Sequence, residues 1–208
     1  MEFLDGVHVQ AFLAGNPSQE LRDRFGGLIF QAGARLHYAG RLLYADPHPG
    51  NYLFRADGRL GFLDFGCVRP YTDREWENNR LADLAVRGGH DDEVRAIRFS
   101  LGLTEGEEID PGYLAQSVEY GRWMWRPYRH DGPFDFGDPS YLREGVDRFT
   151  AVGRTVRAAR VAATWLPMSA FITRWYLGVG AMLYRLRARV DVRAINLRER
   201  LAAGWGPA

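Results

Sequence analysis

Two polar loops flank a stretch that reads as a β-hairpin, and this arrangement constrains the fold more than any other feature of the sequence. Residues 52–63 place apolar side chains on both sides of an Asp-Gly pair, a pattern typical of strand, tight turn and strand. Asp46 and Asn51 precede this hairpin and Asp64 follows it. Because a tight hairpin returns the chain to the end from which it started, we expect these three side chains to converge.

The three side chains have the spacing of a phosphoryl-transfer site. Asp46 and Asn51 form an Asp-x-x-x-x-Asn sequence, and Asp64 opens an Asp-Phe-Gly sequence thirteen residues later. Divalent cations such as Mg²⁺ prefer carboxylate and amide oxygens as ligands. Asp64 is therefore predicted to bind the metal that bridges the phosphates, and Asn51 a second metal. Asp46 is predicted to orient the attacking hydroxyl and accept its proton.

Neighbouring residues are predicted to hold these loops in place. Gly66 allows the backbone to turn sharply after the metal ligand Asp64. His48 lies between two prolines, which stiffen the loop. We therefore expect His48 to fix the loop by hydrogen bonding, and we assign the same positioning role to Gly50.

A second Asp-Phe-Gly sequence occurs at residues 135–137. No apolar strand precedes it, and no asparagine loop lies upstream at the right interval. We interpret this copy as part of a loop, which means that the tripeptide alone is weak evidence for a metal site.

The charge of the chain is carried in an unusual way. All 27 basic residues are arginine, so no reaction here can use a lysine of this chain. Residues 1–139 hold 15 arginines against 22 acidic residues, whereas residues 140–208 hold 12 against 4. The net charge of +1 suggests no nucleic-acid partner. The basic second part suggests contact with a lipid, a partner or a membrane surface, although solvated helix faces are the simpler interpretation.

Cysteine content and hydropathy indicate the compartment. The one cysteine, Cys67, excludes an internal disulfide and fits a reducing environment, and we expect it to be a small buried side chain. The sequence shows no signal segment, and its most apolar stretch, residues 161–172, is shorter than the roughly 20 residues of a membrane span. We therefore expect a cytoplasmic protein, peripheral to a membrane where the basic part makes contact.

The rest of the chain is predicted to be mainly helical. Asn16 is expected to cap a helix that runs to Gly40, with Pro17 at its first position. Thr72 and Glu75 form a capping box that opens another helix. Further helices are expected at residues 91–101, 111–125, 140–163 and 167–189.

The heptapeptide Ala-Asp-Pro-His-Pro-Gly-Asn at residues 45–51, together with Leu-Asp-Phe-Gly at 63–66, closely resembles the UbiB/AarF-type atypical protein-kinase-like family. Residues 1–6 are similar to the hinge segment of that family. Leu166-Pro167 and the apolar helix after it are similar to its C-terminal part. The resemblance therefore runs from residue 1 to about residue 195.

This resemblance implies the C-terminal lobe of a protein-kinase-like fold, mainly α with a small β-hairpin, formed by residues 1–208 as one domain. Residues 1–6 would be the hinge, residues 41–70 the catalytic and metal loops, and residues 71–208 a helical subdomain. The family implies bound ATP and Mg²⁺, kinase or ATPase activity, and a link to the biosynthesis of ubiquinone and other isoprenoid quinones.

Matched residue by residue, the resemblance gives Asp46, Asn51 and Asp64 the roles already assigned. It adds that backbone groups of Glu2 and Leu4 would meet the edge of the adenine ring. Leu53 would lie beneath that ring.

The sequence also departs from the family pattern. Tyr44 stands two residues before Asp46, where the family often has histidine. The family's N-terminal lobe, with its Lys-x-Gly-Gln motif and its ion-paired lysine, is not present in these 208 residues. We expect a missing N-lobe to act in cis or in trans, and the isolated chain to transfer phosphoryl groups inefficiently.

Two rival interpretations remain. A catalytically inactive kinase-like module could bind lipid or protein partners, but all three predicted site residues are retained, which favours an enzyme. A small-molecule phosphotransferase of the aminoglycoside or choline type would share the Asp-x-x-x-x-Asn spacing. The Pro-His-Pro-Gly insert and the Phe-Gly after Asp64 argue against that class.

Overall fold

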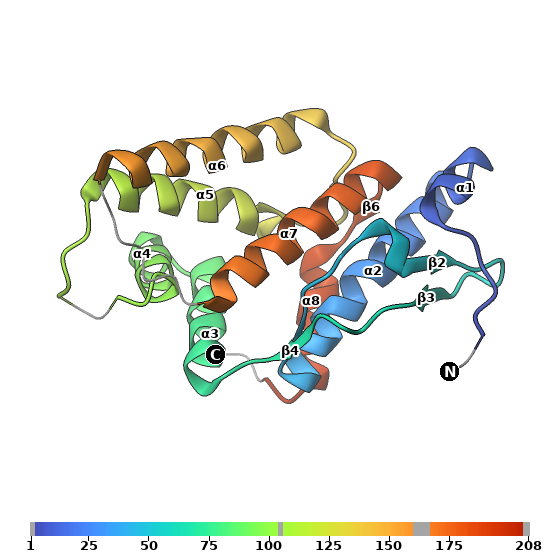
Figure 1. The fold of residues 1–208 in the computed structure, drawn as a ribbon, viewed down its shortest axis with the longest axis horizontal. Coiled ribbons are helices and arrows are strands. Elements are labelled where there is room, and N and C mark those ends of the chain that lie inside the picture. The colour runs from blue at the N-terminus through green and yellow to red at the C-terminus, as the bar shows by residue number, and fades with distance from the viewer. Residues whose placement is uncertain (1–2, 104–105, 160–166, 206–208) are drawn as a thin grey trace. The chain divides into compact units, whose positions relative to one another are not determined.

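A computed structural model describes residues 3–103, 106–159 and 167–205. By its internal packing the chain forms two compact units. The first unit contains residues 1–70, 130–139 and 172–208, and the second contains residues 71–129 and 140–171. The chain is mainly α-helical with short antiparallel strand pairs, which confirms the predicted fold class (Figure 1).

Helices of different lengths form the frame of the first unit. They are α1 (Val9–Ala14), α2 (Gln19–Gly40), the part of α7 (Pro167–Leu186) from residue 172 onward, and α8 (Val192–Ala202). Helices α2 and α8 lie side by side (Figure 1). A methyl group at Gly26 of α2 would lie 2.6 Å from Cβ of Ala188, the residue just before β6, so only glycine permits this segment to approach α2 so closely. Phe25, Met182 and Leu183 are almost completely buried in the core of this unit.

Short strands of the first unit carry the two polar loops. They are β1 (Leu42–Tyr44), β2 (Tyr52–Phe54), β3 (Leu60–Phe62), β4 (Val68–Pro70), β5 (Phe134–Asp135) and β6 (Arg189–Val190), with a 3₁₀ helix η1 (Pro49–Asn51) before β2. Strands β2 and β3 pair antiparallel with Tyr52 opposite Phe62, which confirms the predicted hairpin. Its turn uses Gly58 at a φ of +76°, a conformation that favours glycine. Strand β1 pairs with β4, and β5 pairs with β6.

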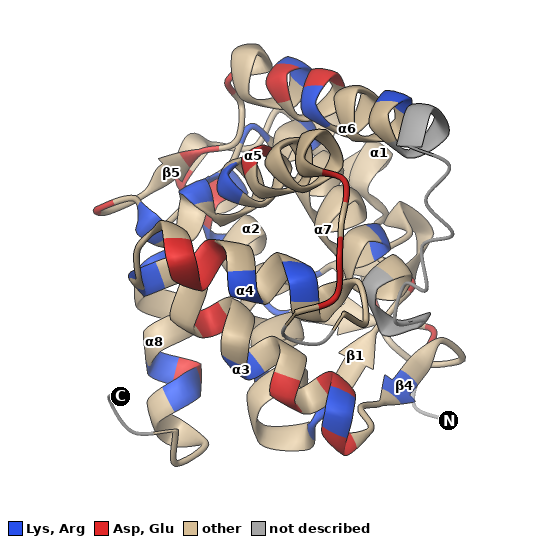
Figure 2. Ribbon diagram, turned by 90° about the vertical axis from the view of Figure 1, so that its left-hand side faces the viewer, with Lys and Arg blue, Asp and Glu red and all other residues tan. Residues whose placement is uncertain are grey.

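Within the described residues, the second unit contains α3 (Asp73–Arg87), α4 (His90–Ser100), α5 (Pro111–Arg129), nearly all of α6 (Pro139–Ala159) and the first turn of α7. The predicted capping box opens α3, since Thr72 accepts a hydrogen bond from the Glu75 backbone and Glu75 accepts one from the Thr72 backbone. Trp123 of α5 stacks on Tyr141 of α6 at a ring distance of 5.0 Å, and its indole nitrogen donates to the Tyr141 carbonyl. Arginine and acidic residues share the surfaces of α3, α4 and α6 (Figure 2).

Several predicted boundaries were wrong. Ser18, not Asn16, caps α2, and its side chain accepts a hydrogen bond from the Leu21 backbone. Helix α5 continues to Arg129, with Pro127 inside it. The second Asp-Phe-Gly sequence is not wholly a loop, because its first residue belongs to β5.

Other differences concern the last third of the chain and the cysteine. Helix α7 ends at Leu186, and β6 and α8, which the sequence did not predict, follow it. Cys67 is exposed, contrary to expectation. Within residues 3–103, 106–159 and 167–205, every helix is too short or too polar to cross a membrane.

Candidate metal and phosphate site

Strand pairing brings the two polar loops to the same end of the hairpin. The backbone N–H of Ala45 donates to the carbonyl of Cys67 at 2.9 Å, just beyond the β1–β4 pair. The backbone N–H of Leu63 donates to the carbonyl of Asn51 at 3.1 Å, just beyond the β2–β3 pair. Each loop is therefore held to the other by backbone hydrogen bonds, and Asp64 follows directly on a residue bound to Asn51.

The carboxylate of Asp46 is held from two sides. The Asn51 side-chain amide donates to Oδ2 of Asp46 at 2.9 Å and to its backbone carbonyl at 3.1 Å. On the other side, Nη2 of Arg174 donates to Oδ1 of Asp46 at 2.7 Å. The Asp46 side chain is 25% exposed, so it remains reachable from solvent. Because Nδ2 of Asn51 makes both bonds to Asp46, its Oδ1 is the atom that can bind a metal.

Asp64 and the loop-positioning residues adopt local turns. Asp64 is exposed, and its Oδ1 accepts a hydrogen bond from the backbone N–H of Gly66 at 2.7 Å. This side-chain-to-backbone turn fixes the direction of the carboxylate. Nδ1 of His48 accepts a hydrogen bond from the backbone N–H of Gly50 at 3.0 Å, so His48 caps η1. That contact is of the positioning kind expected for His48 and Gly50.

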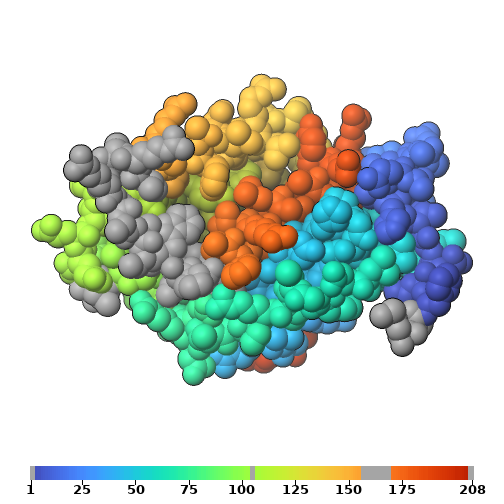
Figure 3. All heavy atoms as spheres, viewed as in Figure 1, coloured from blue at the N-terminus to red at the C-terminus, as the bar shows by residue number. Residues whose placement is uncertain are grey.

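Helix α7 supports the Asp46 loop, a role that the sequence did not indicate. A methyl group at Gly178 would lie 2.2 Å from Cγ of Pro47, so the loop packs directly on the helix backbone. Trp175 of the same helix packs against Gly33 of α2. The orange part of α7 accordingly lies beside the cyan loop region at the surface (Figure 3). The sequence offered only a weak signal for this role, the charge of Arg174 in a mostly apolar segment.

The segment predicted to be the hinge leads into a stretch that pairs with the hairpin. Val7 and Phe54 exchange two backbone hydrogen bonds, at 3.0 and 2.8 Å. A methyl group at Gly61 would lie 3.1 Å from Cδ1 of Leu4 and 3.3 Å from Cβ of Leu53, so these two leucines gather at one spot on the hairpin. Leu53 is 7% exposed. Glu2, the other residue predicted to meet adenine, lies outside the described residues.

Tyr44 lies behind the two loops. Burial raises the pKa of its phenol, and the Asp46 and Asp64 carboxylates and Cys67 raise it further, while the nearby amide of Asn51 opposes the rise. Tyr44 is 3% exposed. Within the described part of the chain, its hydroxyl oxygen makes no hydrogen bond of acceptable geometry.

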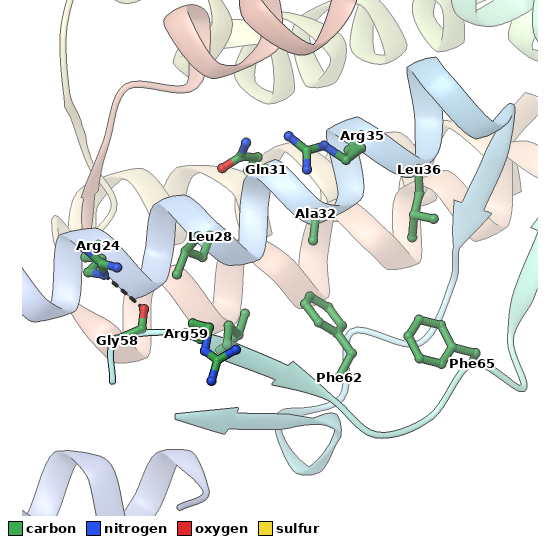
Figure 4. Close-up of a pocket in the computed structure, with 11 residues that line it drawn as sticks. Arg24, Leu28, Gln31, Ala32, Arg35, Leu36, Gly58, Arg59, Phe62 and Phe65 are labelled. Atoms are coloured by element: carbon green, nitrogen blue, oxygen red, sulfur yellow. Dashed lines mark hydrogen bonds between the residues drawn. The ribbon is translucent and has the colours of Figure 1, made fainter. Parts of the chain in front are cut away.

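A groove of about 480 Å³ lies between α2 and the hairpin. Phe62 and Phe65 point from the hairpin side toward α2 (Figure 4). Its three arginines already have partners: Arg24 donates to the Gly58 carbonyl, Arg35 binds Glu199 and Arg59 binds Asp57. Carboxylates therefore balance two of these cations, Arg35 and Arg59, whereas Arg24 is bound to a neutral carbonyl.

The donors in the two loops suit a hard divalent cation. Among the residues that the structure describes, no three His, Cys, Asp or Glu side chains gather as a metal cluster. The predicted set instead combines the carboxylate of Asp64 with the amide oxygen of Asn51, ligand types that Mg²⁺ accepts alongside water and phosphate. The orphaned hydroxyl of Tyr44 nearby also fits a site that gains polar atoms on binding.

A hairpin set between an Asp-x-x-x-x-Asn loop and an Asp-Phe-Gly turn, and packed on a long helix, defines a protein-kinase-like lobe. Residues 1–96 match the family model of the ABC1 atypical kinase-like domain. The resemblance to the UbiB/AarF type is thereby confirmed, and over this segment the chain is similar to the ABC1 atypical kinase-like family.

Individual relatives agree with this assignment. The chain is 40% identical over 133 residues to the uncharacterized protein slr0889 of Synechocystis, a match that covers 62% of this chain and 32% of the relative. It is 28% identical over 76 residues to an uncharacterized aarF domain-containing protein kinase of Arabidopsis thaliana, covering 36% of this chain and 14% of that protein. The match to slr0889 thus spans about a third of that relative.

A solved structure supports the fold. All of this chain superposes on half of Rv3197 from Mycobacterium tuberculosis, described in complex with erythromycin, with a TM-score of 0.68 and 21% identity. At this identity the likeness concerns the fold alone.

Proposed function

We propose that Asp46, Asn51 and Asp64 form the metal-binding and acceptor-orienting part of a phosphoryl-transfer site that takes Mg-ATP. The observation that carries this proposal is the hydrogen bond of 2.9 Å between Asn51 and Asp46, across the four residues that separate them. That bond fixes the Asn51 amide so that its oxygen is available to a metal ion, while the Asp46 carboxylate is available to the attacking group. A metal ligand and an acceptor-binding carboxylate then lie side by side, as phosphoryl transfer requires.

Each residue has a separate role in this proposal. Asn51 and Asp64 would hold Mg²⁺, which neutralises charge on the transferred phosphoryl group. Asp46 would accept a hydrogen bond from the attacking hydroxyl or water and then take its proton. Leu4 and Leu53 would contact the adenine ring. Arg174 supplies a positive charge beside Asp46 in a chain without lysine.

The wider role follows from the family and is part of the same proposal. We infer a kinase or ATPase linked to isoprenoid-quinone or lipid metabolism. The phosphate-covering loop and the lysine of a complete cleft would come from an N-lobe, in cis or in trans. The 208-residue chain by itself should bind Mg-ATP weakly and turn it over slowly, because it lacks that charge stabilisation.

The test is isothermal titration calorimetry of the 208-residue chain with ATP, in the presence of Mg²⁺ and of excess chelator. We expect binding that requires Mg²⁺ and that Asp64→Asn abolishes. Asp135→Asn is the matched control. Asp135 opens the other Asp-Phe-Gly sequence and makes the same turn, accepting from the Gly137 backbone at 2.8 Å.

Three outcomes would overturn the proposal. Binding that persists in chelator would mean that the two loops hold no catalytic metal. Equal losses in the Asp64 and Asp135 variants would mean that the effect is general. Absence of binding at any attainable nucleotide concentration would favour the inactive binding module.

A further inference from the structure

The hydroxyl of Tyr44 is buried beside the candidate site without a hydrogen-bond partner in the described part of the chain. Tyr44 is 3% exposed, so bulk water does not satisfy this group. Buried hydroxyls in native proteins are nearly always hydrogen-bonded, and an exception commonly marks a bound ion, water or ligand. The hydroxyl therefore needs an explanation that the protein atoms do not provide.

The backbone fixes Tyr44 at the junction of the two polar loops. It is the last residue of β1, opposite Val68 of β4, and the next residue is already bound to the Asp-Phe-Gly loop through Cys67. Its ring lies edge-on to Phe62 at 5.9 Å and to Phe65 at 6.2 Å. These contacts hold the ring, so the position of the hydroxyl is set by packing.

The surroundings of the phenol oxygen are those of the predicted metal and phosphate ligands. The amide of Asn51, which is bound to Asp46, and the carboxylates of Asp46 and Asp64 are in its electrostatic surroundings. A tyrosine hydroxyl ordinarily carries its proton near neutral pH, so Tyr44 can donate a hydrogen bond. A donor close to two carboxylates and an amide suits an acceptor that enters with a cation.

We infer that the Tyr44 hydroxyl is a further ligand-binding group of this site, which donates a hydrogen bond to an oxygen brought in with the divalent cation. That oxygen belongs either to a water bound to the metal or to a phosphate of the nucleotide. The inference rests on the proposed function, because it requires Asn51 and Asp64 to hold Mg²⁺.

Tyr44→Phe tests the inference, because it removes the hydroxyl and keeps the ring. Thermal unfolding is measured with and without Mg²⁺, and calorimetry gives the affinities for Mg²⁺ alone and for Mg-ADP. Without metal, the variant should be as stable as the parent chain or more stable, since an unsatisfied buried group is gone. Its affinity in at least one titration should fall by about tenfold to a hundredfold, the value of one hydrogen bond to a charged group.

The two titrations identify the oxygen. A loss with Mg²⁺ alone assigns it to metal-bound water, and a loss only with Mg-ADP assigns it to a phosphate. Tyr38→Phe is the control, since Tyr38 is another buried tyrosine, on α2, whose hydroxyl donates to Asn196. That variant should lose stability and keep both affinities.

The inference and the proposed function fail in different ways. If the parent chain binds Mg-ADP and folded Tyr44→Phe binds both ligands equally well, the inference alone is overturned. If stability and affinity fall together in Tyr44→Phe, the hydroxyl has a structural role and the inference is also overturned. If the parent chain binds neither Mg²⁺ nor Mg-ADP, both ideas fall.

Discussion

Replacing Glu93 with glutamine should destabilise the second unit by about 2–3 kcal/mol. The Glu93 side chain is only 5% exposed and binds two arginines of α5, with Nε of Arg122 at 2.7 Å and Nη2 of Arg129 at 2.8 Å. Arg129 also donates to the carbonyls of Ala85 and Val86 near the end of α3. Glu93 thus joins three helices through one carboxylate.

The magnitude follows from these contacts. Hydrogen bonds to charged groups contribute about 1.5–3 kcal/mol each, and removing one partner of a fully buried ion pair costs about 3–5 kcal/mol. The arginine side chains are 40% and 32% exposed, so water screens part of the loss and the estimate lies below the buried limit. The side-chain oxygen of glutamine can accept a hydrogen bond from one arginine. Its NH₂ group is a donor, however, and cannot bind the second arginine.

Differential scanning calorimetry is the assay. A loss of about 2–3 kcal/mol should lower the midpoint of the unit's transition by roughly 5–10 °C for a chain of this size. Glu77→Gln is the control, because Glu77 forms an exposed pair with Arg80 within α3, where about 0.5 kcal/mol is at stake. A midpoint for the Glu93 variant within about 1 °C of that control would refute the reasoning.

The pH dependence supplies an independent check. Burial opposes ionisation of Glu93, yet hydrogen bonds from Arg129 and Arg122 hold its pKa below the usual value of 4.5. A carboxylate with a lowered folded-state pKa stabilises above its unfolded pKa and loses that contribution as pH falls through the folded pKa. The gap between the two proteins should therefore be constant near neutral pH and shrink below about pH 4.

Three further substitutions test other parts of the structure. Gly178→Ala should lower the free energy of unfolding by about 1–3 kcal/mol and weaken the Mg²⁺ response, because its methyl group would lie 2.2 Å from Cγ of Pro47. The control Gly180→Ala, whose methyl group would have no atom within 4 Å, should not destabilise the chain. Equal midpoints of the two variants in thermal unfolding would contradict this. Arg174→Met should raise Mg²⁺ affinity roughly tenfold or more, since the repulsion between a unit charge and a divalent cation is about 1.7 kcal/mol at roughly 5 Å in water-like surroundings. Calorimetry should show no change for the control Arg193→Met, which breaks the exposed pair with Asp131. Thr72→Ala should cost about 1 kcal/mol through loss of the α3 capping box, and an unchanged urea midpoint would count against it.

Local signals predicted local structure well. The Asp-Gly pair set the hairpin, and the Thr72–Glu75 box set the start of α3, because both depend on bonds within a few residues. Asn16 misled for a physical reason. It adopts a φ of +49° and its N–H donates to the Leu13 carbonyl, so it serves the end of the short helix α1. With Asn16 engaged there, Ser18 caps α2.

The tertiary partners of the site left no comparable signal. The bond between Arg174 and Asp46 joins residues 128 positions apart, and no spacing in the sequence relates them. The same holds for the packing of Gly178 on Pro47. Such contacts depend on where α7 docks, which is decided by burial of Trp175 against α2.

The two Asp-Phe-Gly sequences separate what a motif fixes from what a site requires. Both make the same turn, with aspartate accepting from the glycine N–H at 2.7 Å in one and 2.8 Å in the other. Asp135 extends into β5 and pairs with Arg189 of β6 at 3.8 Å, which supplies its charge partner. Asp64 instead follows Leu63, which is bound to Asn51, and it is close enough to influence the unsatisfied hydroxyl of Tyr44. The tripeptide therefore sets the direction of a carboxylate, and the neighbours decide whether that carboxylate closes an ion pair, as at Asp135, or stays exposed, as at Asp64.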